Sequence, residues 1–276
     1  MAGGRHGIVL AFSLCHVQGA LALNFHFPPR LKPYRLIAET LAPDGARLSL
    51  HEHDGEWHLK LNSRELMSTT STASELRLGE VACERIAGES APRVLIGGLG
   101  FGFSLAAVLA RVRRGAEVHV AELLPEVVTW NREFLREVNG RLLDDPRVKV
   151  LTEDVFHVIR RAGAKAASAY DAILLDVDNG PTSFVQEKNS RLYDRRGFGL
   201  LRRALRPGGR VAFWSATEEP QFIGELRRAG FSAQVVEAKA HERARRFAHR
   251  IYVACCSQAA HETGGGFAAK RRPGSR

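Results

Sequence analysis

The chain has 276 residues, of which 45% are hydrophobic and 25% charged, and its formal net charge is +10. These fractions exclude a disordered or collagen-like chain, and no apolar run approaches the about 20 residues that a membrane-spanning helix needs. The positive charge would suit nucleic acid, but the arginines are spread over several predicted helices and a tail instead of one stripe, which disfavours that partner.

Residues 1–32 form an N-terminal extension that the sequence leaves open. The stretch RHGIVLAFSLCHVQGALAL has a basic start, an apolar middle and a small-residue end, which is typical of a secretory signal. His16 and Gln18 interrupt the apolar middle, so a disordered extension or a wrongly assigned start are the alternatives. The cysteines show no metal-binding spacing, which favours a reduced compartment, and we expect a cytoplasmic protein that holds no metal.

Residues 33–73 alternate apolar and polar side chains, which predicts a small antiparallel β domain. Asp44-Gly45 and Asp54-Gly55 are favourable hairpin turns within it. Three histidines lie on these strands: His51, His53 and His58. Because no further ligand is spaced to complete a metal site with them, we expect exposed strand histidines.

Residues 74–256 alternate short apolar strands with amphipathic helices after a first helix over ASELRLGEVACERI. The seven predicted strands are RVLIGG, EVHVAEL, RVKVLT, YDAILLDV, GRVAFWSA, SAQVVEA and RIYVACC. Helices fall between the first five and before the sixth, and the last two strands form an antiparallel hairpin. This order predicts an α/β, Rossmann-like domain with a doubly wound, mostly parallel seven-stranded sheet. Residues 257–276 are predicted to be a basic flexible tail.

Three features at the carboxyl ends of consecutive strands indicate a nucleotide site. Gly98, Gly100 and Gly102 follow the first strand and precede a helix, where the close approach of a nucleotide requires the absence of Cβ. Glu122 ends the second strand, where a carboxylate can accept hydrogen bonds from both ribose hydroxyls. Asp154 follows the third strand, in a position to meet an adenine amino group. This geometry serves NAD or S-adenosylmethionine, and the E-x-x-P-x-x-V loop from Glu122 favours S-adenosylmethionine.

The motifs VLIGGLGFG, VAELLPEVVTWNREFL, YDAILLDVDNGP and GRVAFWSA, together with the preceding β unit, resemble the spermidine/spermine synthase family of polyamine aminopropyltransferases. The resemblance covers about residues 33–254 and implies a class I methyltransferase-like fold. It implies a transferase in which a small-molecule amine attacks the carbon beside the sulfonium of decarboxylated S-adenosylmethionine and methylthioadenosine leaves. Members of the family are often dimers, so the resemblance also implies a homodimer.

The resemblance assigns roles to residues at the end of the fourth strand. Asp176 matches the catalytic aspartate of the family, and Asp178 and Asn179 follow it in the loop that binds the amine. Acidic groups suit this chemistry because they hold a cationic amine and one can accept the proton of the attacking nitrogen. Tyr193, in RLYDRRGFG, is a candidate contact to the acceptor, although core packing is the alternative interpretation.

The chain also departs from the family pattern. Gly100 stands where the family carries an aspartate that binds the propylamine of the donor, and Asn179 stands where a second aspartate is usual. A glutamine and a tyrosine that the family draws from its N-terminal domain have no evident counterpart. Two enzymatic functions therefore stay open: aminopropyl transfer with altered amine specificity, and methyl transfer from S-adenosylmethionine on the same scaffold. A non-catalytic adenosyl-binding or nucleic-acid-binding module is the third hypothesis.

Overall fold

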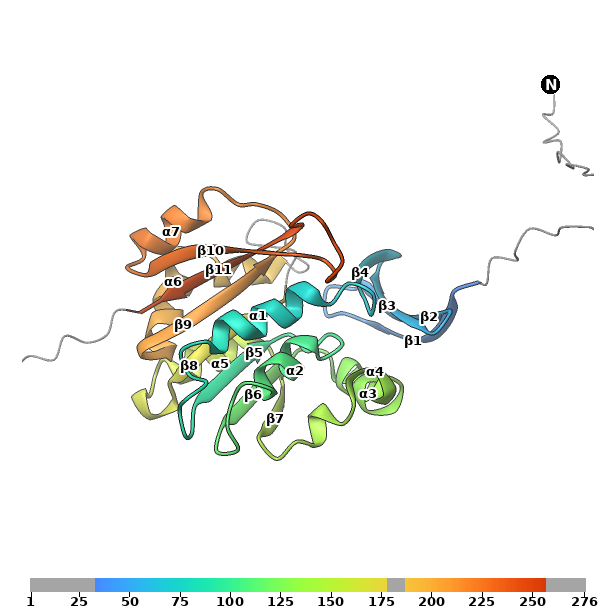
Figure 1. The fold of residues 1–276 in the computed structure, drawn as a ribbon, viewed down its shortest axis with the longest axis horizontal. Coiled ribbons are helices and arrows are strands. Elements are labelled where there is room, and N and C mark those ends of the chain that lie inside the picture. Colours follow the sequence, from blue (N-terminus) through green and yellow to red (C-terminus); the bar gives the residue numbers. More distant parts are fainter. Residues whose placement is uncertain (1–32, 178–186, 257–276) are drawn as a thin grey trace, which may run out of the picture.

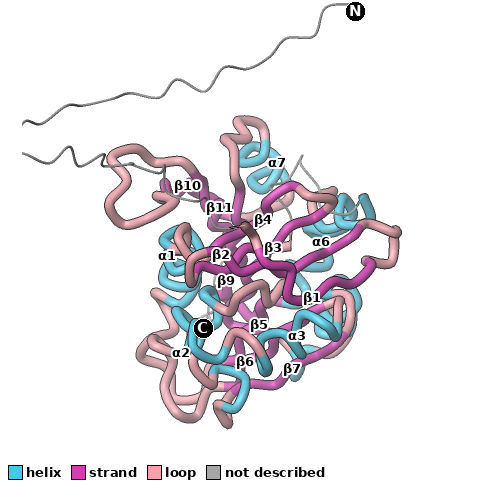
Figure 2. The backbone as a smooth tube through the Cα atoms, turned by 90° about the vertical axis from the view of Figure 1, so that its right-hand side faces the viewer, coloured by secondary structure: helices cyan, strands magenta, loops and turns pink. Residues whose placement is uncertain are grey.

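The computed structural model describes residues 33–177 and 187–256. They form a four-stranded sheet and a seven-stranded sheet with helices (Figure 1). The smaller sheet lies at one end of the larger one, and Figure 2 looks onto it with strands of the larger sheet behind. None of the helices within these residue ranges is long and apolar enough to cross a membrane.

The four-stranded sheet is an antiparallel meander in the order β1-β2-β3-β4. Its strands are β1 (Arg35–Leu41), β2 (Arg47–His53), β3 (Glu56–Leu61) and β4 (Arg64–Ser68). Gly45 and Gly55 have φ values of 85° and 83° in the first two turns, which suits glycine because it has no Cβ. Both predicted hairpins are therefore confirmed.

The expectation of exposed histidines on this sheet is wrong. His58 is only 8% exposed, and its Nδ1 lies 2.8 Å from Oε2 of Glu65. Tyr34 covers the same face, with its ring 4.3 Å from that of His53 and 5.0 Å from that of His58. Strand alternation does not reveal this cover, because Tyr34 comes from the segment that precedes the first strand.

Helix α1 (Ala73–Cys83) connects the two sheets and packs against α2 (Phe103–Leu109). A Cβ on Gly79 would lie 2.5 Å from Cβ of Ala107, so the absence of a side chain there lets the two helices approach closely. This contact places the N-terminal turn of α1 beside the start of α2, and it determines where Glu75 lies.

The seven-stranded sheet has the order β10-β11-β9-β8-β5-β6-β7. The strands are β5 (Arg93–Gly97), β6 (Glu117–Glu122), β7 (Val148–Thr152), β8 (Tyr170–Leu175), β9 (Leu205–Ser215), β10 (Ser232–Ala238) and β11 (His249–Cys255). The first five pair in parallel, whereas β11 pairs antiparallel with both β9 and β10. The predicted mostly parallel sheet and its antiparallel hairpin are confirmed, with β11 inserted between β9 and β10.

Helices cover both faces of this sheet. The remaining α-helices are α3 (Pro125–Glu133), α4 (Arg136–Asn139), α5 (Val155–Ala162), α6 (Arg195–Ala204) and α7 (Phe222–Arg228). Short 3-10 helices are η1 (Leu142–Asp144), η2 (Ala166–Ser168) and η3 (Glu187–Leu192). Alternate residues of β5 separate the two cores: Val94 and Ile96 pack with α1, α2 and α3, and Leu95 packs with α5, α6 and α7. The predicted doubly wound fold is therefore confirmed.

The strand order changes side at β5. Strands β6 and β7 follow it on one side, and β8 and β9 lie on its other side. In open α/β sheets, ligands bind in the crevice outside the carboxyl ends of the strands at such a switch point. The glycine loop follows β5, and Asp176 follows β8. The topology therefore brings these two segments to one crevice.

Candidate active site

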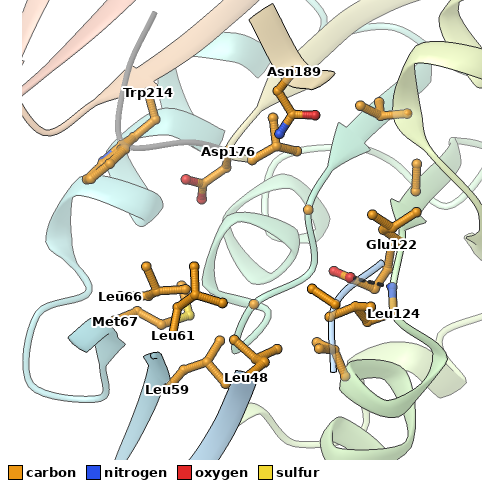
Figure 3. A pocket seen from close by; sticks show the side chains of 18 of the residues that line it. Leu48, Leu59, Leu61, Leu66, Met67, Glu122, Leu124, Asp176, Asn189 and Trp214 are labelled. Carbon is orange, nitrogen blue, oxygen red and sulfur yellow. Dashed lines mark hydrogen bonds between the residues drawn. The ribbon is translucent and has the colours of Figure 1, made fainter. Parts of the chain in front are cut away.

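A cavity lies between the carboxyl ends of the central strands and the four-stranded sheet (Figure 3). Its wall on the side of the large sheet includes five residues predicted from the sequence: Gly98, Gly100, Glu122, Asp154 and Asp176. The structure therefore brings together the glycine loop and the acidic residues that follow three different strands.

The first glycine of the loop lies in direct contact with the backbone of the Asp176 segment. Gly98 has a φ of +89°, and a Cβ there would lie 2.4 Å from the carbonyl oxygen of Asp176. Its N–H donates to the carbonyl oxygen of Ala121 at 2.9 Å, and the N–H of Asp176 donates to Gly97 at 3.0 Å. These bonds connect the carboxyl ends of β5, β6 and β8. The positive φ and the close contact with Asp176 require glycine at position 98.

The third glycine supports the loop from outside the cavity. Gly102 adopts a left-handed conformation as the N-cap of α2, and its N–H donates to the carbonyl oxygen of Leu99 at 2.8 Å. It is not among the residues that line the cavity. Gly102 therefore turns the chain into α2, and its contact with a ligand stays a prediction.

Two asparagines that the sequence did not single out hold the loop. Nδ2 of Asn131, on α3, donates to the carbonyl oxygen of Gly100 at 2.8 Å, and Asn131 is only 2% exposed. Nδ2 of Asn139 donates to Oδ1 of Asn131 at 2.6 Å and to the carbonyl oxygen of Phe101 at 3.3 Å. The carbonyl groups of Gly100 and Phe101 lie in the loop before α2, and these bonds give them hydrogen-bond donors.

The middle glycine faces the four-stranded sheet. Gly100 has a φ of +51°, and a Cβ there would lie 2.7 Å from Cε and 2.9 Å from Sδ of Met67. Met67 belongs to β4 and lines the same cavity. The methionine thus fills the space that a side chain at position 100 would need.

Glu122 ends β6 and is 8% exposed. Its Oε2 accepts from the N–H of Leu99 at 2.9 Å, and its Oε1 accepts from the N–H of Leu124 at 2.9 Å. Burial raises the pKa of Glu122, and these backbone donors oppose that effect. The N–H of Leu123 is a third backbone donor that lowers this pKa, so about one of the roughly four acceptor positions of the carboxylate remains for a hydroxyl group of a ligand.

Asp154 lies at the cavity and begins α5. Its Oδ1 accepts from the N–H of Phe156 at 2.8 Å, as expected for an N-cap, and its Oδ2 accepts from Arg191. The guanidinium of Arg191 also lies 4.0 Å from the ring centroid of Phe156. Both oxygens of Asp154 therefore have partners within the protein, and an adenine amino group would compete with Arg191.

Asp176 projects into the cavity directly after β8 (Figure 3). Oγ of Ser104, at the start of α2, donates to its Oδ2 at 3.2 Å. Loss of surrounding water raises the pKa of Asp176 to about 6, and the bond from Ser104 opposes the shift. A carboxyl group with this pKa is largely ionised at neutral pH and still basic enough to accept a proton.

Glu75 is the second carboxyl group at this end of the cavity, and no sequence motif indicated it. It lies in the first turn of α1, is 7% exposed, and accepts from Oγ of Ser74 at 2.7 Å. Burial and the negative charge of Asp176 raise the pKa of Glu75 to about 7. Ser104 contacts both residues, since its Oγ lies 3.5 Å from the backbone carbonyl oxygen of Glu75 and 3.2 Å from Oδ2 of Asp176.

Comparisons with known proteins identify the family. The model of the spermine/spermidine synthase domain matches residues 86–225. The chain belongs to the spermine/spermidine synthase family. The family indicated by the motifs is therefore confirmed, and the region matched includes the glycine loop, Glu122, Asp154 and Asp176.

Relatives within this spermine/spermidine synthase family include two bacterial enzymes. The polyamine aminopropyltransferase of Mycobacterium tuberculosis is 32% identical over 174 residues, which are 58% of this chain and 31% of that protein. Polyamine aminopropyltransferase 2 of Pseudomonas aeruginosa is 39% identical over 125 residues, 43% of this chain and 32% of that protein. The chain thus spans about a third of the length of these curated relatives.

Solved spermidine synthases share the fold. One in complex with the transition state analogue AdoDATO gives a TM-score of 0.59 at 20% identity, covering 80% of this chain and 72% of that chain. The spermidine synthase of Thermotoga maritima gives 0.58 at 19% identity, with the same coverage of both chains.

Tyr193, a candidate contact to the acceptor, is not among the residues that line this cavity. Tyr193 packs in the core, with its ring 5.8 Å from Phe213 and 6.1 Å from Phe222, and it lines a different hollow beside α6 and α7. Its predicted contact with an acceptor is therefore not supported. Asp178 and Asn179 lie outside the described residues. Within the described part of the chain, no group of three His, Cys, Asp or Glu side chains is arranged to hold a metal ion.

Proposed function

We propose that this protein transfers an aminopropyl group from decarboxylated S-adenosylmethionine to an amine. The observation that carries the proposal is the position of Asp176, a carboxyl group with a raised pKa that lines one cavity with the glycine loop and lies near a second carboxyl group, that of Glu75. The relatives named polyamine aminopropyltransferase support the same reaction.

The adenosyl part of the donor would lie along the carboxyl ends of β5 and β6. Glu122 would accept a hydrogen bond from a ribose hydroxyl with the acceptor capacity that its backbone bonds leave. Gly98 lines the cavity beside Glu122, and its missing Cβ lets the loop pack against the backbone of Asp176. Asp154 and Val155 would meet the base, with Arg191 displaced from Asp154 or retained beside it.

In the reaction, the nitrogen of a neutral amine forms a bond to the propyl carbon, and the carbon–sulfur bond breaks with its electron pair remaining on sulfur. Methylthioadenosine leaves as a neutral thioether. The attacking nitrogen becomes positively charged, and Asp176 accepts its proton. Glu75 and Asp176 stabilise the cationic groups by placing negative charge beside them, in a site from which water is partly excluded.

A second candidate, methyl transfer from intact S-adenosylmethionine, is favoured by the Gly100–Met67 contact. The family aspartate that would bind the propylamine and repel the carboxylate of the intact compound has no counterpart at Gly100, and Met67 fills the space. Glu75 and Asp176 favour the decarboxylated donor, since their negative charges would oppose a carboxylate on the ligand. We therefore rank aminopropyl transfer first.

The test is calorimetric titration with decarboxylated S-adenosylmethionine, S-adenosylmethionine and methylthioadenosine. We expect the decarboxylated donor to bind at least about 10-fold more tightly than the intact one, a difference of about 1.4 kcal/mol. Tighter binding of S-adenosylmethionine would instead support methyl transfer, and binding of none of the three would contradict both functions.

The Glu122→Ala variant provides the site control for this titration. Loss of the ribose acceptor should weaken all three ligands by about 10- to 100-fold, because hydrogen bonds to a charged group contribute about 1.5–3 kcal/mol. Glu133→Ala is the matched surface variant, since Glu133 is exposed at the end of α3 and does not line the cavity. Equal affinities for the Glu122→Ala variant and the wild type would contradict the proposed donor position.

A further inference from the structure

We propose that a band of arginines at the edge of the seven-stranded sheet opposite the cavity binds double-stranded nucleic acid through its phosphate groups. The inference concerns a second surface of the molecule and does not depend on the proposed transfer reaction. It is carried by a short motif that recurs at the ends of three neighbouring helices.

The motif consists of an aliphatic residue, two arginines and an alanine. It occurs as IRRA, LRRA and LRRA at the ends of α5, α6 and α7, over residues 159–162, 201–204 and 226–229. The aliphatic residues are buried in one core beneath these helices: Ile159, Leu201 and Leu226. The arginines that follow them are exposed: Arg160, Arg161, Arg202, Arg203, Arg227 and Arg228. We name these six residues the arginine band.

The members of the arginine band lie at one edge of the sheet. Helices that connect parallel strands run back from the carboxyl ends to the amino ends, so the last turns of α5, α6 and α7 lie at the amino ends. A Cβ on Gly163, just after α5, would lie 3.2 Å from Cβ of Arg203 on α6. Nη1 of Arg202 donates to the carbonyl oxygen of Ala229, after α7, at 3.1 Å. The three helix ends therefore form one continuous surface, on the edge away from the glycine loop and Asp176.

Positive charge is segregated to this face of the sheet. Helices α5, α6 and α7 carry eight arginines and one glutamate, whereas α1, α2 and α3 on the other face carry two arginines and four glutamates. The residues outside the described ranges contain two acidic residues, Asp178 and Glu262, against seven lysines and arginines, so they cannot neutralise the band. Arginines that are spread along the sequence are thus gathered in space, which removes the reason for disfavouring nucleic acid.

Each pair in the band has one arginine with a partner inside the protein. These pairings are Arg161 with Glu153 at 2.6 Å, Arg202 with the carbonyl oxygen of Ala229, and Arg227 with the carbonyl oxygen of Ala233 at 3.1 Å. The second members, Arg160, Arg203 and Arg228, form no hydrogen bond or ion pair with any described residue. Each helix end therefore offers at least one guanidinium group to a ligand.

The chemistry and size of the band fit the backbone of a duplex. Guanidinium groups stay charged and bind phosphate oxygens through two parallel hydrogen bonds. Neighbouring helices lie about 8–10 Å apart, so the band spans about 20 Å, the length of about six base pairs. The large exposed apolar side chains of the described residues lie outside α5, α6 and α7. The band therefore offers neither a stacking platform for single-stranded bases nor an apolar face for insertion into a membrane.

The experiment is a titration of the full-length protein into a fluorescently labelled DNA duplex of about 20 base pairs, followed by anisotropy between about 50 and about 200 mM salt. We expect the logarithm of the binding constant to fall linearly with the logarithm of the salt concentration. The slope should be at least about 3 in magnitude, because each phosphate contact contributes about 0.9. Absence of binding at about 50 mM salt, or a slope near zero, would overturn the inference.

The variant Arg160→Gln/Arg203→Gln/Arg228→Gln removes one arginine from each helix end and keeps those that bond within the protein. Glutamine has nearly the helix propensity of arginine, so the fold should persist, which urea titration checks. We expect duplex affinity at about 50 mM salt to fall at least about 10-fold and the slope to decrease by about 3. The corresponding triple lysine variant retains the charge and should keep the slope of the wild type.

The charge-matched control is Arg85→Gln/Arg114→Gln/Arg132→Gln, which changes exposed arginines after α1, after α2 and on α3. It loses the same net charge from the other face and should keep the slope of the wild type. Equal losses of affinity and slope in the two glutamine variants would contradict the position of the band, because total charge alone would then determine binding.

Two further ligands test the class of partner: a DNA single strand of the same length and vesicles that contain phosphatidylserine. We expect the duplex to bind more tightly than either, and tighter binding of the single strand or the vesicles would overturn the inference. Methylthioadenosine affinity should be the same in the wild type and in both glutamine variants, since the band lies away from the cavity. Failure of duplex binding is thus distinguishable from failure of the proposed transfer reaction.

Discussion

Glu75 and Asp176 are two carboxyl groups held near each other with raised pKa values of about 7 and about 6. Burial is the main cause for both, and the negative charge of Asp176 adds to the shift of Glu75. Two neighbouring carboxyl groups do not ionise independently, so activity should report the protonation of the pair. Transfer needs Asp176 ionised, and the rate should therefore rise as pH increases through about 6 to 7.

The Glu75→Gln variant tests this coupling. Glu75 is still largely protonated where Asp176 loses its proton, and glutamine imitates that neutral form, so the acidic limb of the kcat/KM profile should stay near pH 6 without a component near pH 7. Glu89→Gln, which changes an exposed carboxylate after the same helix, should leave the profile unchanged. A Glu75→Gln profile whose acidic limb moved well below pH 6 would contradict this order, because it would show that Glu75 ionises first and raises the pKa of Asp176.

The residues predicted from the sequence were those whose position follows from strand order alone. Gly98, Glu122 and Asp176 each follow a central strand, and parallel strands bring their carboxyl ends to one edge. Glu75 was missed because its position depends on the contact between α1 and α2 at Gly79. Met67 was missed because a methionine on an alternating strand is ordinarily a core residue.

Among the elements, α3 supports the glycine loop through the side chain of Asn131. The Asn131→Ala variant loses bonds to the carbonyl oxygens of Gly100 and Val127, so we expect the free energy of unfolding to fall by about 1–3 kcal/mol. Donor affinity should also fall, because the backbone of the loop is no longer held in place.

Denaturant titration and calorimetry with methylthioadenosine measure these two effects of Asn131→Ala. Thr129→Ala is the control, since Thr129 is exposed on the same helix and its Oγ1 bonds only within α3, to the carbonyl oxygen of Pro125. If Asn131→Ala lowered stability but left methylthioadenosine affinity equal to that of the control, Asn131 would have no part in shaping the donor site.

Element order was predictable, whereas element ends and strand neighbours depended on tertiary packing. Helix α1 ends at Cys83, three residues before the end of the predicted segment at Ile86. Strand β9 begins at Leu205, four residues before the predicted start at Gly209. The position of β11 between β9 and β10 follows from long-range pairing, which local patterns do not encode.

At the scale of the whole molecule, the raised pKa values of Asp176 and Glu75 lower the free energy of unfolding at neutral pH. The pKa values of Asp176 and Glu75 rise from 3.8 and 4.5 to about 6 and about 7 on folding. The folded protein therefore binds their protons more tightly than the unfolded chain does. The stability that these groups contribute is complete below about pH 4 and is lost as pH rises through about 6 to 7.

The double variant Asp176→Asn/Glu75→Gln isolates this effect. Its free energy of unfolding relative to the wild type should increase between about pH 5 and about pH 8, by an amount on the order of 2 kcal/mol. Urea titrations at several pH values measure the difference, in which the contributions of all other ionisable groups cancel. A difference that stays constant with pH would contradict the raised pKa values.

The sequence predicted the doubly wound sheet and the β unit beside it, because each follows from local patterning and turn chemistry. It did not predict that one wall of the cavity would be formed by Leu48, Leu59, Leu61, Leu66 and Met67. That wall arises only when the four-stranded sheet lies against the carboxyl edge of the larger sheet. The homodimer implied by the family stays a prediction.

The central claim is that Asp176 accepts a proton from an amine that attacks the propyl carbon of the donor. The most direct measurement is analysis of the amine and nucleoside products of wild-type and Asp176→Asn protein by mass spectrometry. We predict equal amounts of aminopropylated amine and methylthioadenosine from the wild type. Asp176→Asn should form at least about 100-fold less of both while binding methylthioadenosine normally. Turnover of Asp176→Asn at the wild-type rate, or methylated amine from S-adenosylmethionine as the principal product, would contradict the account.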